Sequence, residues 1–224
     1  MKFKTVKNKN AIVIGMLLGD ACIQKDGRMV IGHGEQQKEY VEYKKQILQN
    51  FFTVVDYEQT INLQEKQFKQ IGIKCYTNSY LKNMRKIFYK NNKEINMRQL
   101  KKLNPLGLAL WYMDDGSLVF QRKNGIIESR KGYLNTQCFS REENEIMVQY
   151  FKEVHNINCK IHLDKGMCRL YFNSSELKKL IKIIEPYVID SMKYKICMRY
   201  GKNKAKENLC QKECSECSSY CKLK

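Results

Sequence analysis

The chain contains the same order of predicted helices and strands twice. Residues 11–52 run as an apolar helix, a Gly-Asp pair, a short polar turn, a strand and an amphipathic helix, and residues 106–154 run in the same order. Asp20 and Asp115 hold equivalent places, 115 − 20 = 95 residues apart. Self-similarity of this kind predicts one structural unit that is repeated, and it limits the fold more than any single motif does.

Two strand-like stretches and a further helix follow each copy. Apolar and polar residues alternate between Ile71 and Tyr76, which is typical of a sheet with one buried face. The pattern of each half therefore predicts helices and strands in the order α-β-β-α-β-β-α. The predicted fold class is α+β with two pseudo-symmetric repeats. The expected strands cover 57–65 and 69–77 in the first half, and 159–165 and 168–174 in the second. The expected domains are a first repeat (8–95), a polar linker (96–104), a second repeat (105–200) and a basic, Cys-rich C-terminal tail (201–224).

The charge balance predicts an anionic partner. Lys and Arg number 41 against 23 Asp and Glu, a formal net charge of +18, which exceeds what solubility needs and favours nucleic acid. No apolar run approaches the roughly 18 residues that span a bilayer, and the start lacks a signal peptide. We therefore expect an intracellular protein without a membrane partner, in a bacterial or phage-host cytoplasm or in an organelle matrix or stroma.

The ten cysteines divide into two groups. Six are scattered through apolar segments, where a reduced cysteine acts as a small core residue. The other four, near the C-terminus, follow one another at spacings of four, three and four, unlike the two short pairs of familiar zinc knuckles. They could hold Zn²⁺ if the segment bends, or form a reduced tail without metal. These four are Cys210, Cys214, Cys217 and Cys221.

An acid closes the most apolar helix of each copy. A carboxylate at a helix C-terminus lies at the negative end of the helix dipole and costs about 0.3–1 kcal/mol. Asp-Gly also makes turns, and a single pair would be explained that way. Two acids at matched spacing instead predict a bound cation, and hard oxygen ligands suit Mg²⁺.

Small residues in the same helices predict that the two acids meet. The small residues are Gly15, Gly19, Gly107 and Ala109, and they let two helices approach closely. Asp20 and Asp115 would then lie next to each other, which requires cations between them, and paired metals suit phosphodiester hydrolysis. Asp114, one residue inside its helix, is expected to cap the helix or to form a local salt bridge.

At this point the sequence resembles a known family. The stretches "VIGMLLGDA" at 13–21 and "LALWYMDDG" at 108–116 resemble the two signature helices of the LAGLIDADG homing endonucleases in their single-chain, two-repeat form. The tracts at 33–44, 134–140 and 191–196 resemble the I-SceI-like subgroup. The resemblance covers about residues 10–200 and implies a curved, saddle-shaped DNA-binding surface of β-strands.

The resemblance also implies roles for individual residues. Asp20 and Asp115 would hold catalytic Mg²⁺, for which Mn²⁺ substitutes, and Ala21 and Gly116, directly after them, are counted with the metal ligands. A lysine would support the hydrolytic water or the leaving oxygen at each site.

Three positions are expected to complete the catalytic site, with differing agreement to the family pattern. Lys195 matches the family lysine, whereas Lys93 stands one residue early with Glu94 at the aligned place, and either lysine could instead be solvated. Gln137 matches a polar residue near the acid, and its first-half counterpart falls near Gly32 or His33.

Polar residues along the strands are expected to bind double-stranded DNA. A β-ribbon fits the major groove, and two halves would follow on the order of 20 base pairs. Since the halves differ, the site should be long and asymmetric, read by a monomer; the alternative for each residue is a solvated sheet face. The expected DNA-binding residues are Gln24, Lys25, Arg28, His33, Gln59, Asn62, Gln64, Lys69, Lys74, Arg122, Lys123, Asn135, Lys160, His162 and Arg169.

The predicted function is a site-specific, Mg²⁺-dependent endonuclease that cuts both DNA strands. The resemblance implies a short 3′ overhang and an origin in a mobile element. The start "MKFKTVKNKN" favours an intron-encoded or independent protein over an intein, because no splicing-domain cysteine or terminal Asn flanks it. Two alternatives stay open, an intron RNA maturase and a DNA-binding regulator of the same fold that does not cleave.

Overall fold

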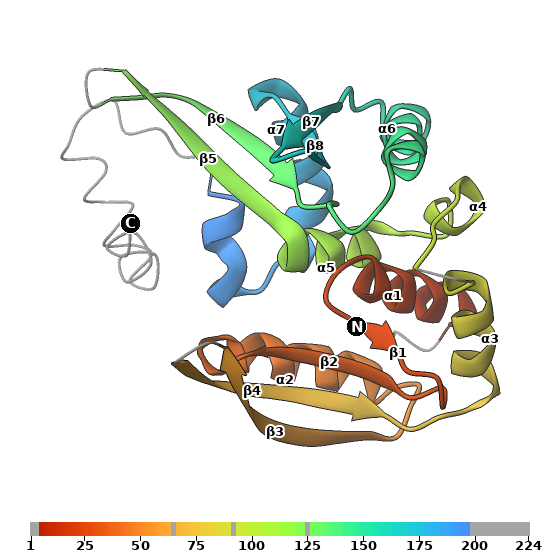
Figure 1. Ribbon diagram of the computed structural model, residues 1–224. Helices are drawn as coiled ribbons and strands as arrows, with labels where there is room; N and C mark the ends of the chain where they lie inside the picture. Colours follow the sequence, from red (N-terminus) through yellow and green to blue (C-terminus); the bar gives the residue numbers. More distant parts are fainter. Residues whose placement is uncertain (1–4, 64–65, 91–92, 124–125, 198–224) are drawn as a thin grey trace.

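Two repeats stack on either side of a central pair of helices (Figure 1). The computed structural model describes residues 5–63, 66–90, 93–123 and 126–197. The central helices are α1 (Val6–Leu18) and α5 (Pro105–Asp115). Each opens one repeat, and the order αββαββα that the sequence predicted is confirmed in both.

The first repeat continues from α1 into an antiparallel sheet of order β1-β2-β4-β3. Strands β3 and β4 both begin three residues earlier than the sequence predicted, and their hairpin is correspondingly long. The elements are β1 (Cys22–Ile23), β2 (Met29–Gly34), η1 (Glu35–Gln37), α2 (Lys38–Leu48), β3 (Val54–Leu63), β4 (Lys66–Cys75) and α3 (Ser79–Phe88).

The second repeat has the matching sheet order, β5-β6-β8-β7. The described strands thus form two separate four-stranded sheets, and the two central helices lie between the halves. The elements are β5 (Gly116–Lys123), β6 (Ile126–Leu134), α6 (Arg141–His155), β7 (Lys160–Asp164), β8 (Met167–Phe172), α7 (Ser174–Ile184), η2 (Glu185–Tyr187) and η3 (Asp190–Lys195).

The linker between the repeats contains a short helix, α4 (Met97–Leu100), that the sequence analysis did not predict. Asn96 begins it through a reciprocal capping box with Gln99, which satisfies two backbone N–H groups that a helix leaves free. The buried side chain of Leu100 ties it to the core. Pro105 occupies the first turn of α5, where its missing N–H costs nothing.

Contact between α1 and α5 holds the repeats together. A Cβ on Gly15 would overlap the backbone carbonyl of Gly107, and a Cβ on Gly107 would overlap the carbonyl of Ala11. The predicted close approach through small residues is therefore confirmed. Residues 11–14 and 16–18 are almost fully buried, as expected for the second half of α1, which is apolar on all sides. This packing brings the C-terminal ends of both helices to one place.

Within the described part of the chain, no helix has both the length and the apolar character that crossing a membrane requires.

Candidate active site and nucleic-acid interface

The two predicted acids lie at the C-terminal ends of the central helices. Asp20 follows α1, which ends when Gly19 donates its N–H to the Gly15 carbonyl at 3.3 Å. Asp115 is the last residue of α5. Their neighbours Ala21 and Gly116 donate backbone N–H groups to carbonyls about one turn back in the same helices, and their part in metal binding stays a prediction.

Both carboxyl groups are harder to ionise than usual. Burial, and next the nearby Asp114 carboxylate, raises the pKa of Asp20. The same two causes, with Asp20 as the third, raise the pKa of Asp115 to about 7. Asp20 nevertheless keeps 43% of its side chain exposed. Half-exposed carboxylate oxygens that repel one another suit a hard divalent cation, so the residues present are compatible with Mg²⁺ or Mn²⁺.

A lysine lies at each helix end. Lys195 donates its Nζ to the carbonyls of Met113 at 2.5 Å and of Asp114 at 2.8 Å. Lys93 donates to the carbonyl of Gly19 at 3.3 Å. A cation is favourable at the negative end of a helix dipole, and the two lysines are placed similarly in the two halves. Burial lowers the pKa of each, while the acids oppose that shift.

The structure settles which residue of "KE" at 93–94 faces the site. The Glu94 side chain forms an ion pair with Lys90 at 3.4 Å and is 42% exposed, whereas Lys93 reaches α1. Lys93 stands one residue before the position that matches the family lysine. It pairs there with Tyr89 as an isolated β-bridge.

Asn135 takes a different place from the one predicted. We expected it to bind DNA, but its backbone N–H and its Nδ2 both donate to the Asp115 carbonyl, at 3.0 and 2.9 Å. It follows β6 directly and so reaches the end of α5. Gln137, expected next to the acid, is half-buried in the same loop and makes none of the described hydrogen bonds to Asp115.

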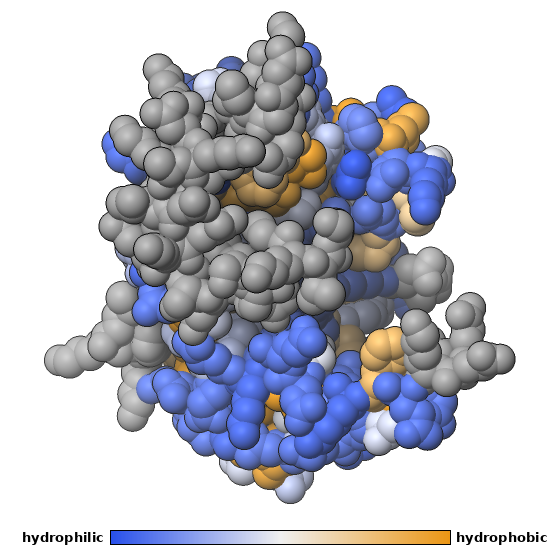
Figure 2. All heavy atoms as spheres, turned by 90° about the vertical axis from the view of Figure 1, so that its left-hand side faces the viewer, coloured by the Kyte–Doolittle hydropathy of each residue, from blue (hydrophilic) through white to orange (hydrophobic). Residues whose placement is uncertain are grey.

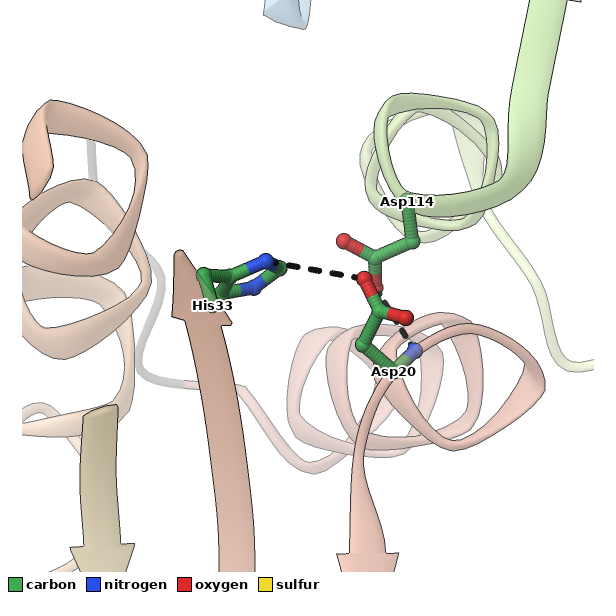
Figure 3. Close-up of side chains that lie close together, drawn as sticks. All are labelled: Asp20, His33 and Asp114. Atoms are coloured by element: carbon green, nitrogen blue, oxygen red, sulfur yellow. Dashed lines mark hydrogen bonds and ion pairs between the residues drawn. The ribbon is translucent and has the colours of Figure 1, made fainter. Parts of the chain in front are cut away.

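Asp114 and His33 also depart from the predictions. Asp114 makes no local bond: its carboxylate pairs with Lys44 of α2 at 2.6 Å and accepts the N–H of Asp20 at 3.2 Å. His33 was expected to bind DNA, yet it is only 6% exposed. Like Met29 and Ile31, it lies on the inward side of β2, and its ring lies beside Asp20 (Figure 3).

Lys44 is a site residue that the sequence analysis missed. It lies on the buried face of α2, four residues after Tyr40 and three before Ile47. A charged residue within an apolar stripe at helical spacing is a signal that could have identified it.

Most of the expected DNA-binding side chains are exposed. Those on the surface are Gln24, Lys25, Arg28, Gln59, Asn62, Lys69, Lys160 and His162. Two others are held over aromatic rings: Lys74 over Tyr57 at 4.4 Å and Arg169 over Tyr133 at 3.9 Å. The visible surface of the first repeat, in the lower part of Figure 2, is mostly hydrophilic. This surface is compatible with binding a polyanion.

Several predicted residues lie outside the described parts of the chain. Gln64 is one, together with the side chains of Arg122 and Lys123. The C-terminal tail with Cys210, Cys214, Cys217 and Cys221 is another.

Replacing Asp115 by Asn should change stability in a pH-dependent way. Below about pH 4 the carboxyl is protonated in both states; as the pH rises to about 7, the unfolded chain ionises first, so the wild type loses stability. Without divalent cations, Asp115→Asn should therefore be more stable by roughly 2–4 kcal/mol at pH 8 and equal at pH 4. Urea unfolding at both pH values measures this.

Mg²⁺ supplies the control for that experiment. Added at pH 8, it should stabilise the wild type more than Asp115→Asn, because a cation that binds only the folded state stabilises it. Equal stabilisation of both proteins by Mg²⁺ would show that Asp115 is not a ligand of the cation.

Comparison with known proteins gives the family. The model of the LAGLIDADG DNA endonuclease family matches residues 10–180, and the chain belongs to this family. Its form is that of two repeats in a single chain, similar to I-WcaI. The solved structure of the homing endonuclease I-WcaI bound to its DNA recognition sequence aligns with a TM-score of 0.75 at 23% identity, covering 86% of this chain and 87% of that one.

Curated relatives have different names. The chain is 26% identical to Protein RecA of Mycobacterium gastri over 84% of its own length and 47% of that protein, so it spans about half of this relative. It is 25% identical to a probable intron-encoded endonuclease of Wickerhamomyces canadensis, covering 85% of this chain and 84% of that protein. It is 28% identical to the cytochrome b mRNA maturase bI2 of Debaryomyces hansenii, covering 83% and 72%.

Proposed function

We propose that this protein is a site-specific DNA endonuclease of the homing type, which cuts both strands of a long asymmetric target. The observation that carries the proposal is the meeting of Asp20 and Asp115 at the ends of two closely packed helices, each with a lysine at the same helix end. Family membership gives the reaction class, and the site supplies the groups that this reaction needs.

Asp20 and Asp115 would hold Mg²⁺, with Mn²⁺ as a substitute, through their carboxylate oxygens. A bound divalent ion would supply Lewis-acid polarisation of the scissile phosphate and neutralise its developing charge. Lys93 and Lys195 keep cationic groups beside the two carboxylates, where they can orient a water or donate a proton to a leaving oxygen. Asn135 fixes the backbone of Asp115.

The two sheets and the turn between β1 and β2 would read DNA through their outward side chains. Exposed amides such as Gln24 and Gln59 can pair with base edges, while exposed lysines such as Lys25 and Lys160 can bind phosphates. The two halves differ at most of these positions, so we expect an asymmetric site and a monomeric protein. The protein would act where its target DNA lies, in a cytoplasm or an organelle matrix.

Cleavage of the uninterrupted target tests the function. The target is taken from the intron-less junction of the host gene or selected from a random duplex library, and is incubated with the protein and Mg²⁺. We expect a double-strand break with a short 3′ overhang, mapped by sequencing both ends. Bound but unchanged DNA would instead indicate a DNA-binding protein that does not cleave.

RNA maturase activity is the second candidate, because one relative carries the name of an mRNA maturase. Both acids are present in this chain, which favours cleavage. Faster splicing of the host intron, with the target DNA left intact, would support the maturase.

Binding of the target should weaken steeply with salt. Each neutralised phosphate contributes roughly −0.9 to the slope of log K against log salt. Lys25→Gln should make the slope shallower by about one, measured by anisotropy with Ca²⁺ in place of Mg²⁺. Lys101→Gln is the control, because Lys101 lies in the linker and pairs with Glu153 of α6 at 3.1 Å. A wild-type slope near zero would contradict the proposed interface.

A further inference from the structure

A fully buried ion pair lies beneath Asp20. Lys44 Nζ and Asp114 Oδ1 are 2.6 Å apart, and neither side chain is exposed to solvent. Removing two charges from water is costly, and a buried pair of this kind is seldom more stabilising than apolar residues of the same volume. Its presence in the core therefore calls for a role other than stability.

The pair connects the two repeats at the candidate site. Lys44 belongs to α2 of the first repeat and Asp114 to α5 of the second. The other oxygen of Asp114, Oδ2, accepts the backbone N–H of Asp20 at 3.2 Å, so Asp114 bonds to the first repeat through both of its oxygens (Figure 3). Since both Asp114 oxygens are in use, the carboxylate holds the backbone of Asp20 in one place.

Lys44 is itself held on three sides. Its Nζ lies 2.9 Å from His33 Nε2 and 4.3 Å from the centre of the Tyr40 ring. The far nitrogen of the imidazole, Nδ1, lies 2.8 Å from Gln37 Oε1. Lysine can only donate, so Nε2 of His33 must accept and Nδ1 carries the proton that it donates to Gln37. The result is one chain of bonds from Gln37 to the amide of Asp20.

The second half-site lacks this arrangement. The residue equivalent to Asp114 is Gly19, again 95 positions apart (114 − 19). Gly19 has no side chain to offer to Asp115, and a Cβ there would overlap the Asp114 carboxylate. The buried residues of α6, the counterpart of α2, are Asn144, Met147, Tyr150 and Phe151, and they include no cation.

A metal site is the competing explanation of the same residues. Ligand atoms of Asp20, His33 and Asp114 lie within 4.8 Å of one another. However, the ammonium of Lys44 already lies between His33 and Asp114, and the Nδ1 that faces Asp20 at 3.6 Å carries a proton. A cation is thus already present where the metal would bind.

We propose that His33, Lys44 and Asp114 are positioning residues that fix Asp20, and that they make the first catalytic half-site depend on the second repeat while the second half-site has no such support. The inference rests on the proposed nuclease function. It follows that disturbing this unit changes the cutting of the two DNA strands unequally.

Two double variants separate positioning from folding. Lys44→Met/Asp114→Leu removes both charges and leaves the Asp20 amide without its acceptor, whereas Lys44→Met/Asp114→Asn removes both charges but keeps an acceptor oxygen. Both avoid an unpaired buried charge. Lys45→Met is the control, because the neighbouring Lys45 pairs with the exposed Asp56 at 2.6 Å.

The first measurement is strand-resolved cleavage of an end-labelled duplex. The ratio of the two nicking rates should change at least about tenfold in the Leu variant, in line with the loss of a hydrogen bond to a charged group. The Asn variant, which keeps the acceptor but loses Lys44, should change the ratio less than the Leu variant does, and Lys45→Met should keep the wild-type ratio. Equal slowing of both strands in the Leu and Asn variants would overturn the proposal.

The second measurement needs neither DNA nor metal, so it remains decisive if the protein cuts nothing. Hydrogen exchange at the Asp20 amide should be at least about tenfold faster in the Leu variant than in the Asn variant, because only the latter retains the acceptor. Equal exchange would overturn the positioning role. Mn²⁺ binding by calorimetry that loses one site in His33→Asn would also overturn it, in favour of a metal.

Discussion

Asp20→Asn and Asp115→Asn should each slow DNA cleavage by at least about 10³-fold, equivalent to roughly 4 kcal/mol of transition-state stabilisation. Asparagine keeps the size and one oxygen of the side chain but cannot offer a charged ligand. Both acids lie among cationic and anionic groups at the end of the helix pair, so removing one charge should change cation binding more than it changes the fold. Single-turnover cleavage with excess protein measures the effect.

DNA affinity provides the control for these variants. Measured with Ca²⁺ or EDTA, binding should remain largely intact, because the acids lie at the helix ends and the polar side chains expected to bind DNA lie mainly on the strands and in the turn between β1 and β2. Glu94→Gln is a matched comparison, since this acid pairs with Lys90 away from the helix ends and should cleave as the wild type does. Wild-type cleavage by either Asn variant would refute the assignment of the site.

Gly15→Ala should destabilise the protein by about 2–4 kcal/mol, although alanine is the better helix former. The added methyl group would overlap the backbone carbonyl of Gly107, and backbone in the centre of two packed helices cannot shift without separating the repeats. Urea unfolding monitored by circular dichroism measures the loss. Cleavage should fall as well, because the two acids are brought together by this contact.

Gly34→Ala is the control for the helix contact. Gly34 ends β2, has open space where a Cβ would be, and has an ordinary negative φ of −62°. Its replacement should change stability by no more than about 0.5 kcal/mol. If Gly15→Ala were equally mild, the helices would not require their close approach.

The two halves of the site differ in how far the sequence predicted them. Asp20 and Asp115 could be found because the repeat places them at matched positions, and a duplicated fold brings equivalent residues to equivalent places. Lys195 followed from the family pattern. Lys93 could not be separated from Glu94 by alignment alone, since it is the packing of Lys93, which pairs with Tyr89 in an isolated β-bridge, that turns its side chain toward α1.

The errors have a common physical origin. His33 and Asn135 are polar residues in or beside strands, so they were expected to face DNA, but the side of a strand that a residue faces depends on its register in the sheet. Asp114 was expected to bond locally, but its partner is Lys44, 70 residues away in sequence. Such pairings arise only when distant elements pack.

By itself, the amino-acid sequence determined the repeat, the α+β order of elements, the positive charge and the two acids at helix ends, because each depends on local pattern or composition. The tertiary structure alone decided that the strands form two sheets and that Lys44 of α2 pairs with Asp114 of the other repeat. It also decided that one catalytic half-site carries a buried support which the other lacks. These features depend on how helices and strands far apart in the chain pack, and packing between distant segments leaves no periodic trace in either segment.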